Sequence, residues 1–277
     1  MKLNTLAIAV AASLVSFSAQ ADIKIGGDIG VGYFQSSSGD NELKEVGSEI
    51  NVDGSQKVGG TTYFGHVEMD MDGTGNTAEF EEIRVGAKGA WGELRLGETD
   101  NACDWLDVGG YPDKFMGLQS QGGCKGSDVS NIAYKRSMGA ATVAVSHNPN
   151  GTEYNAIGIQ GKIGPVKASL GYEAGDALGS SDKNVTLGLY GSFGPVNVGL
   201  RANRADSFND TDVGVHAAYT AGANKFYVGF GNDETDRDSW AAGYNRKLGS
   251  KTTFVVEARD QDGQAETEYG IGLIHAF

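Results

Sequence analysis

Long apolar runs and proline are both scarce in this 277-residue chain. After residue 21 no stretch approaches the roughly 20 apolar residues that a membrane-spanning helix requires. This argues against a helical membrane protein, although an exported soluble protein would satisfy the same observation. Glycine is abundant, with 43 residues against 4 prolines, and apolar residues are scattered. Because they alternate with polar residues instead of recurring at i, i+3 and i+4, the pattern predicts strands.

Basic residues are also in short supply. The chain has 22 Lys and Arg against 36 Asp and Glu, a formal net charge of −14. A nucleic-acid-binding protein needs a basic surface, so nucleic acid is not expected as a partner. The acidic balance favours an interior or rim that attracts cations.

Only two cysteines are present, Cys103 and Cys124. In an oxidising compartment they are expected to form one structural disulfide, which closes a loop of about 20 residues and contributes roughly 3 kcal/mol. A metal site built on them would need further ligands nearby, and none is evident.

Histidine, a common catalytic base, occurs four times. Ser146 and His147 are adjacent, so in a strand their side chains point to opposite faces. His275 falls on the outward face of the expected terminal strand. Nothing selects a nucleophile and base on one face, so we do not expect an enzyme. The other two histidines are His66 and His216.

The first 21 residues have the features of a cleavable export signal. Lys2 supplies a positive charge, Leu6 to Phe17 is a short apolar core, and Ala19-Gln20-Ala21 fits a cleavage site. We therefore expect a signal peptide at 1–21 and one barrel domain at 22–277. Removal of Lys2 changes the net charge from −14 to −15.

Sixteen segments of alternating apolar and polar residues follow. Each is close to the length of about 9–11 residues that a tilted strand needs for one membrane crossing. Short turns alternate with longer polar connectors, as the periplasmic turns and external loops of an outer-membrane barrel do. Aromatic residues lie near strand ends, as interfacial girdles would. The sequence thus predicts an all-β transmembrane antiparallel barrel in the outer membrane of a Gram-negative bacterium. The segments are 23–34, 44–57, 60–72, 78–89, 92–98, 129–137, 139–148, 153–163, 165–174, 183–193, 195–205, 210–220, 223–232, 236–248, 251–260 and 268–277.

Three stretches resemble the general bacterial porins, which are trimeric sixteen-stranded diffusion pores. Tyr269 to Phe277 (YGIGLIHAF) is similar to the Phe-terminated signature by which such barrels are recognised for insertion. Ile83 to Gly97 (IRVGAKGAWGELRLG) resembles the family's fourth and fifth strands, and Ser130 to Tyr134 (SNIAY) the start of its sixth. The resemblance implies a homotrimer that contacts outer-membrane lipid and lipopolysaccharide and passes small hydrophilic solutes and cations.

In that family the loop between strands five and six folds into the barrel and narrows it. Here this connector, residues 99–128, is by far the longest, and loops beyond about 12–15 residues are usually functional or disordered. We expect its acids to line a constriction that draws cations, although an ordinary solvated loop is the alternative. The acids proposed for the constriction are Asp100, Asp104, Asp107 and Asp113.

The expected facing wall departs from the family's basic pattern. Glu49 and Asp53 share the inferred lumen face of the second strand, where arginines are typical of the family. Arg84 and Arg95 remain basic candidates, and simple alternation places Arg84 inward with Glu82. We therefore expect a cation-preferring pore. The alternatives are a substrate-specific channel and a non-conducting structural or adhesive barrel.

Residues 70–81 also match the ligand spacing of a calcium-binding EF-hand loop. An EF-hand needs helices on both sides, whereas these flanks alternate like strands, so an ordinary hairpin is favoured. Calcium stays a weak candidate, and no other cofactor is expected. The weak calcium ligands are Asp70, Asp72, Thr74 and Glu81.

Overall fold

The computed structural model describes residues 22–72, 77–118, 122–124, 129–150, 154–175, 183–206, 211–233 and 235–277. The expected signal peptide, 1–21, lies outside the described residues. Within these ranges no helix is long and apolar enough to span a membrane.

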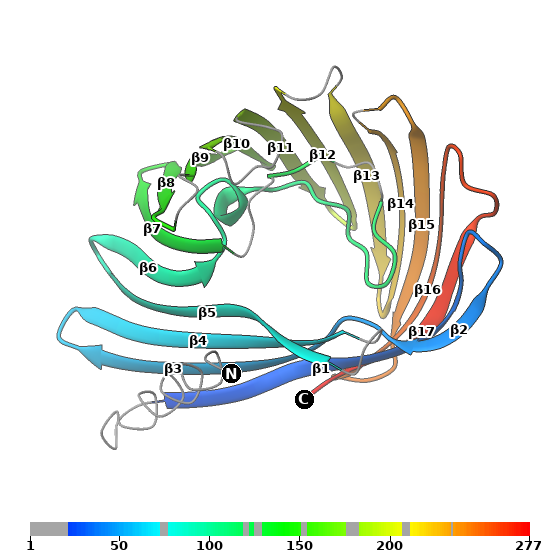
Figure 1. Ribbon diagram of the computed structural model, residues 1–277, viewed down its shortest axis with the longest axis horizontal. Helices are drawn as coiled ribbons and strands as arrows, with labels where there is room; N and C mark the ends of the chain where they lie inside the picture. The colour runs from blue at the N-terminus through cyan, green and yellow to red at the C-terminus, as the bar shows by residue number, and fades with distance from the viewer. Residues whose placement is uncertain are drawn as a thin grey trace.

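The strands form one closed antiparallel barrel. The first strand, β1 (Asp22–Gln35), pairs with the last, β17 (Glu268–Ala276), and this pairing closes the ring seen in Figure 1. Both β2 (Asn41–Glu45) and β3 (Ser48–Val58) pair with β1, so together they make a single crossing. The structure therefore has sixteen crossings, and the predicted fold class is confirmed.

The other strands follow the predicted segments to within about two residues at each end. They are β4 (Thr61–Asp72), β5 (Thr77–Gly89), β6 (Gly92–Thr99), β7 (Val129–Met138), β8 (Ala141–Asn148), β9 (Tyr154–Ile163), β10 (Val166–Gly175), β11 (Lys183–Phe193), β12 (Val196–Ala205), β13 (Asp212–Ala221), β14 (Asn224–Asn232), β15 (Asp238–Lys247) and β16 (Thr252–Gln261).

The second crossing differs from the prediction because a bulge interrupts it. Val31 of β1 pairs with Glu45, and Asp28 pairs with Glu49. Between these two pairs the second crossing advances by four residues while β1 advances by three, so the second crossing has one extra residue. Gly47 takes the extra step at φ 58°, a left-handed conformation that glycine adopts without steric cost. The crossing begins at Asn41, earlier than the predicted 44, because residues before the bulge also pair with β1.

A second irregularity lies in the β4–β5 hairpin. Glu68 faces Glu82, but Met69 faces Phe80, so Glu81 is the extra residue. Simple alternation therefore holds from Glu82 to Arg84 and fails across Glu81. The face of each β5 side chain depends on this one bulge.

Burial along the strands is inverted relative to a soluble protein. Ile157, Leu170 and Leu273 are 47%, 50% and 47% exposed, whereas Glu173 and Thr186 are buried. An apolar outer surface and a polar inner face are what a bilayer requires, because lipid replaces water around the barrel. We refer to the face opposite the exposed apolar side chains as the polar face.

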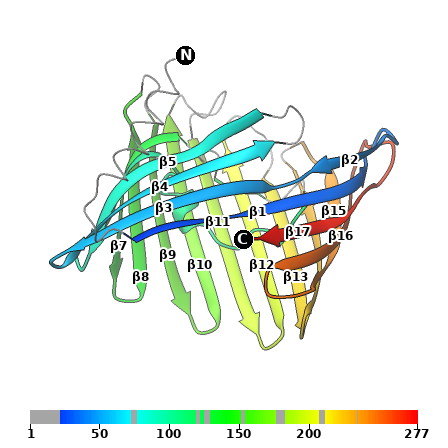
Figure 2. The same cartoon turned by 90° about the horizontal axis from the view of Figure 1, so that it is seen from below.

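Connector length alternates around the ring, as the sequence predicted. Two-residue turns join β7 to β8, β9 to β10 and β11 to β12 at the lower rim of Figure 2, and the longer described connectors 36–40 and 262–267 lie at the other rim. The longest connector follows β6. The two hydrophobic clusters in the described residues both form where this connector meets the polar face.

Candidate functional site

The connector after β6 is described at residues 100–118 and 122–124, and we call these residues the inner segment. A short 3₁₀ helix, η1 (Asp104–Leu106), lies near its start and contacts β8, β9 and β10. Cys103 and Cys124 form a disulfide with their Cα atoms 5.9 Å apart, so the predicted disulfide is confirmed. Figure 1 shows the inner segment in green, beside β9 to β14. The disulfide ties its two described parts together.

The start of the inner segment is anchored on Glu173 of β10. The amide of Asn101 donates hydrogen bonds of 2.8 Å to Glu173 Oε1 and to the hydroxyl of Tyr154. The Tyr154 hydroxyl itself donates to Glu173. Asn184 of β11 donates to the other carboxylate oxygen at 2.6 Å. Glu173 is fully buried, and these donors compensate for the loss of its hydration.

The middle of the inner segment is held by an ion pair. Asp107 Oδ2 lies 2.6 Å from Arg201 Nη2 of β12. Ser169 of β10 donates to Asp107 Oδ1 at 3.2 Å, and the backbone N–H of Val108 donates to Ser169 Oγ at the same distance. Asp107 thus connects the segment to two strands.

The far end is anchored on Glu257 of β16. Its carboxylate accepts the backbone N–H groups of Lys114, Phe115 and Met116 at 2.8, 2.9 and 2.5 Å. The Tyr227 hydroxyl of β14 also donates to it. One buried carboxylate therefore replaces the partners that this stretch of backbone would have in regular secondary structure.

Glycine makes room for the inner segment on the polar face. A Cβ at Gly158 of β9 would overlap the carbonyl oxygen of Ala102, and one at Gly188 of β11 would overlap that of Val108. A Cβ at Gly171 would overlap the Cys103 sulfur. Part of the high glycine content thus has a local cause, since the segment's backbone lies directly against these strands.

Trp105 of η1 lies between two cationic side chains of the barrel wall. The Arg95 guanidinium is 3.9 Å and the Lys135 ammonium 3.8 Å from its ring centre. Such contacts contribute about 0.5–2 kcal/mol each. Arg95 also pairs with Glu93 at 2.8 Å. Arg95 of β6 and Lys135 of β7 are therefore both engaged with the inner segment.

The polar face of β3 to β5 is acidic. Asp53 and Glu68 both contact His66, and Glu49 accepts a 2.8 Å hydrogen bond from Asn51. Glu49 and Glu68 also lie in one group with Asp70, with their oxygens within 4.8 Å of one another. In Figure 1 these strands lie across the ring from β10 to β13. The wall facing the anchored segment thus carries several carboxylates.

Burial changes the acidity of the inner segment. It raises the pKa of the Asp104 carboxyl to about 7, and the nearby Asp100 charge adds to the rise. Burial also raises the pKa of Asp107 and Asp113 above the usual range, although the Arg201 cation opposes the rise at Asp107. Asp104 therefore changes charge near neutral pH.

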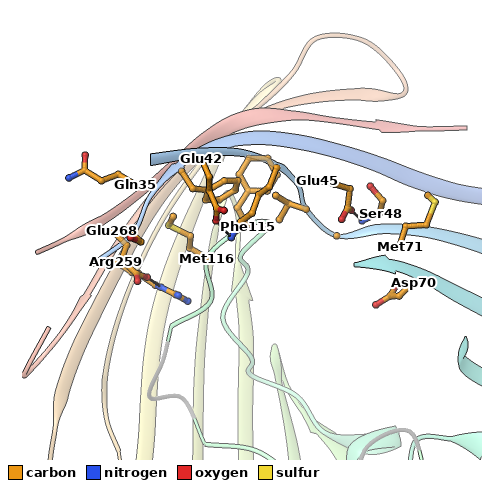
Figure 3. A pocket seen from close by; sticks show the side chains of 15 residues that line it. Gln35, Glu42, Glu45, Ser48, Asp70, Met71, Phe115, Met116, Arg259 and Glu268 are labelled. Carbon is orange, nitrogen blue, oxygen red and sulfur yellow. Dashed lines mark hydrogen bonds and ion pairs between the residues drawn. The ribbon is translucent and has the colours of Figure 1, made fainter. Parts of the chain in front are cut away.

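A cavity of ≈ 340 Å³ is lined by residues 115 and 116 of the inner segment and by residues of the first and last strands. Figure 3 shows Phe115 and Met116 among the side chains that line it, with Arg259 and Glu268 on one side. The Phe115 ring packs edge-on against Phe34 of β1, with centroids 5.6 Å apart. Arg259 pairs with Glu268 at 2.5 Å, so opposite charges lie beside an apolar contact.

The sequence of residues 5–266 matches the family profile described as Gram-negative porin. The chain belongs to this family. A search of curated protein sequences found no significant match. Solved structures with the same fold include an OmpT loop-deletion mutant from Vibrio cholerae (TM-score 0.77, 14% identity, covering 93% of this chain and 99% of that chain). An anion-selective porin from Comamonas acidovorans has TM-score 0.70 and 18% identity over 93% and 100% of the two chains.

A mutant of the Rh. blastica porin is similar as well, with TM-score 0.73 and 17% identity over 93% and 100% of the two chains. Identities this low show a shared fold. Together with the family match, they place this porin in the Gram-negative outer membrane.

Three of the predicted site residues contact residues outside the predicted set. Asp107 pairs with Arg201, Arg95 contacts Trp105, and Arg84 pairs with Glu82 on the polar face. The flanks of the calcium candidate are the paired strands β4 and β5, as the hairpin alternative predicts, while Thr74 lies outside the described residues.

Sequence reasoning missed the wall residues that hold the inner segment in this porin. Glu173 follows the largely apolar Leu170–Tyr172 stretch of β10, and Glu257 follows the apolar Phe254–Val256 stretch of β16. A charge within a membrane strand is costly on the lipid side, so it belongs on the polar face. That signal identifies both positions, but their backbone and amide partners are visible only in the structure.

Proposed function

We propose that this porin is a cation-preferring diffusion channel whose lumen is narrowed by residues 99–128. Sixteen strands leave a water-filled interior, and solutes pass down their gradients without a catalysed reaction. The observation that carries the proposal is the anchoring of the inner segment on the polar face at Glu173, Arg201 and Glu257.

The balance of charge supports the cation preference. Four arginines of the wall lie against carboxylates, which reduces their net contribution. Three other acids of the wall have no arginine in the contacts described above: Asp53 and Glu68 contact His66, and Glu49 contacts Asn51. In those contacts their negative charge is not offset by an arginine. The acids proposed to line the constriction are Asp100, Asp104, Asp107, Asp113, Glu49 and Asp53, with Arg84 and Arg95 as the basic members.

We propose a homotrimer as the assembled form. A solved structure with the same fold is described as the trimer form of OmpT from Vibrio cholerae, with TM-score 0.75 and 14% identity. The apolar outer face of the strands would meet neighbouring subunits or lipid and lipopolysaccharide. Chemical cross-linking in detergent should yield a trimer, and a monomer as the largest species would contradict this.

Reversal potentials in a planar bilayer under a KCl gradient test the channel. We expect stepwise openings with a reversal potential of cation sign, and a twofold or larger drop in the K⁺/Cl⁻ permeability ratio for Asp53→Asn combined with Glu49→Gln. An anion-sign potential contradicts the cation preference. A silent bilayer with folded protein contradicts the channel and favours a structural or adhesive barrel. Saturation of the current by one solute at low concentration favours a substrate-specific channel.

A further inference from the structure

We propose that His66, Glu68 and Glu82 form a binding site for a divalent transition-metal ion of the zinc type. His66 and Glu68 are two residues apart on β4, so their side chains share one face. Glu82 of β5 is the cross-strand partner of Glu68. Two adjacent strands thus bring an imidazole and two carboxylates together on the polar face.

The separations of the ligand atoms suit a tetrahedral ion. His66 Nε2 lies 3.3 Å from Glu68 Oε2 and 3.3 Å from Glu82 Oε2. Ligands about 2.0–2.1 Å from a tetrahedral zinc ion are roughly 3.3–3.4 Å apart. All three atoms lie within 4.8 Å of one another, so one ion can reach each of them.

Asp53 supplies the support that metal-binding histidines usually have. Its Oδ1 lies 2.8 Å from His66 Nδ1, and this hydrogen bond directs the other ring nitrogen toward the two glutamates. With Nδ1–H donating to Asp53, Nε2 presents a lone pair to two carboxylate oxygens. Three acceptors then converge. Arg84 offsets the charge of Glu82, and a second ring proton or a metal ion would hold all three acceptors together.

Burial strengthens the case for an ion. The side chains of His66 and Glu82 are 10% and 9% exposed, so little water reaches the point where the three atoms meet. Buried like charges repel strongly unless a cation lies between them.

The local charge matches a divalent ion. Arg84, the cross-strand neighbour of His66, contacts the Glu82 carboxylate. With a neutral imidazole, the charges of Asp53, Glu68, Glu82 and Arg84 sum to −2, which one divalent ion neutralises. The imidazole ligand favours zinc, nickel or copper over calcium or magnesium, which prefer oxygen ligands alone.

Isothermal titration of the folded barrel in detergent with zinc chloride tests the site. We expect one zinc per chain, with affinity lowered at least about 100-fold in His66→Gln and Glu82→Gln and about 10–100-fold in Asp53→Asn. Glu68→Gln provides a further ligand variant should one of these fail to fold. His147→Gln is the matched control, because this exposed histidine of β8 contacts Asn155 and should leave binding unchanged.

Two outcomes would overturn the proposal. Wild-type barrel that takes up no zinc shows that the cluster is not a zinc site. Unchanged zinc binding in both folded ligand variants places the ion elsewhere on the protein. Heat-modifiable migration on gels checks that each variant is folded. The zinc titration is independent of channel activity, so it tests the metal site separately from the proposed function. Zinc binding by a barrel that carries no current would support the metal site while contradicting the diffusion channel.

Discussion

Asp107 of the inner segment and Arg201 of β12 form an ion pair with 2.6 Å between Oδ2 and Nη2. The Asp107 side chain is 2% exposed, so removal of Arg201 leaves a buried carboxylate without its cationic partner. The position of Asp107, in the middle of the inner segment, therefore depends on Arg201 of β12, which lies nearly one hundred positions later in the sequence.

Arg201→Gln should release the middle of the inner segment. Breaking a buried ion pair costs about 3–5 kcal/mol, more than the neighbouring hydrogen bonds from Ser169 replace. We expect open-channel current noise to increase severalfold in single-channel recordings. Arg204→Gln, on the exposed face of the same strand, is the control and should record like wild type. Equal noise in all three proteins would contradict a positioning role for the pair.

Glu257→Gln should loosen residues 114–116. A hydrogen bond to a charged group contributes about 1.5–3 kcal/mol, and this carboxylate accepts three backbone N–H groups. We expect hydrogen exchange of these amides to accelerate at least tenfold (the equivalent of about 1.4 kcal/mol). Glu266→Gln, an exposed acid that contacts Gln35, is the control. Unchanged protection in Glu257→Gln would show that other contacts hold this end.

Cation preference should fall as the pH drops through neutrality. The pKa of Asp104 is raised to about 7, so its carboxylate is charged at pH 8 and largely neutral at pH 6. Reversal potentials in a KCl gradient should become less cation-selective over this range. Asp104→Asn should remove most of the change, whereas Asp40→Asn, in the exposed connector after β1, should preserve it. A pH response that survives Asp104→Asn would assign it to another group.

Gly158→Ala should displace the start of the inner segment, because the new Cβ would overlap the carbonyl oxygen of Ala102. Gly161→Ala on the same strand is a matched control, since its nearest atom is 3.7 Å away. We expect the single-channel conductance to change by about a third or more for the first variant only, as overpacking forces the backbone to shift. Identical conductance in both variants would mean that the segment adapts without moving into the lumen.

Reduction of the disulfide should make the inner segment accessible to protease. The bond links positions 21 apart, and a loop of this size contributes about 3 kcal/mol. Without reductant, a thiol probe should label neither Cys103 nor Cys124; after reduction it should label both, and cleavage between them should accelerate at least tenfold. Labelling before reduction would contradict the bond.

The sequence predicted the number of strands, the alternation of short and long connectors, and the position of the longest connector. These features depend on local alternation and on turn residues, which a single chain displays directly. The bulges at Gly47 and Glu81 did not follow, because a bulge is a relation between two paired strands. Most strand ends lie within about two residues of the prediction, whereas these two bulges are visible only in the structure.

The sequence by itself determined an acidic, exported barrel with a disulfide-closed loop, because composition and periodicity act locally along the chain. Only the tertiary structure decided which wall residues hold that loop. Glu173 and Glu257 lie 72 and 143 positions from partners they bind, and closure of the ring brings them together. Pairing of β4 with β3 and β5 likewise sets His66 between Asp53, Glu68 and Glu82, since cross-strand neighbours are fixed by register and not by spacing in sequence.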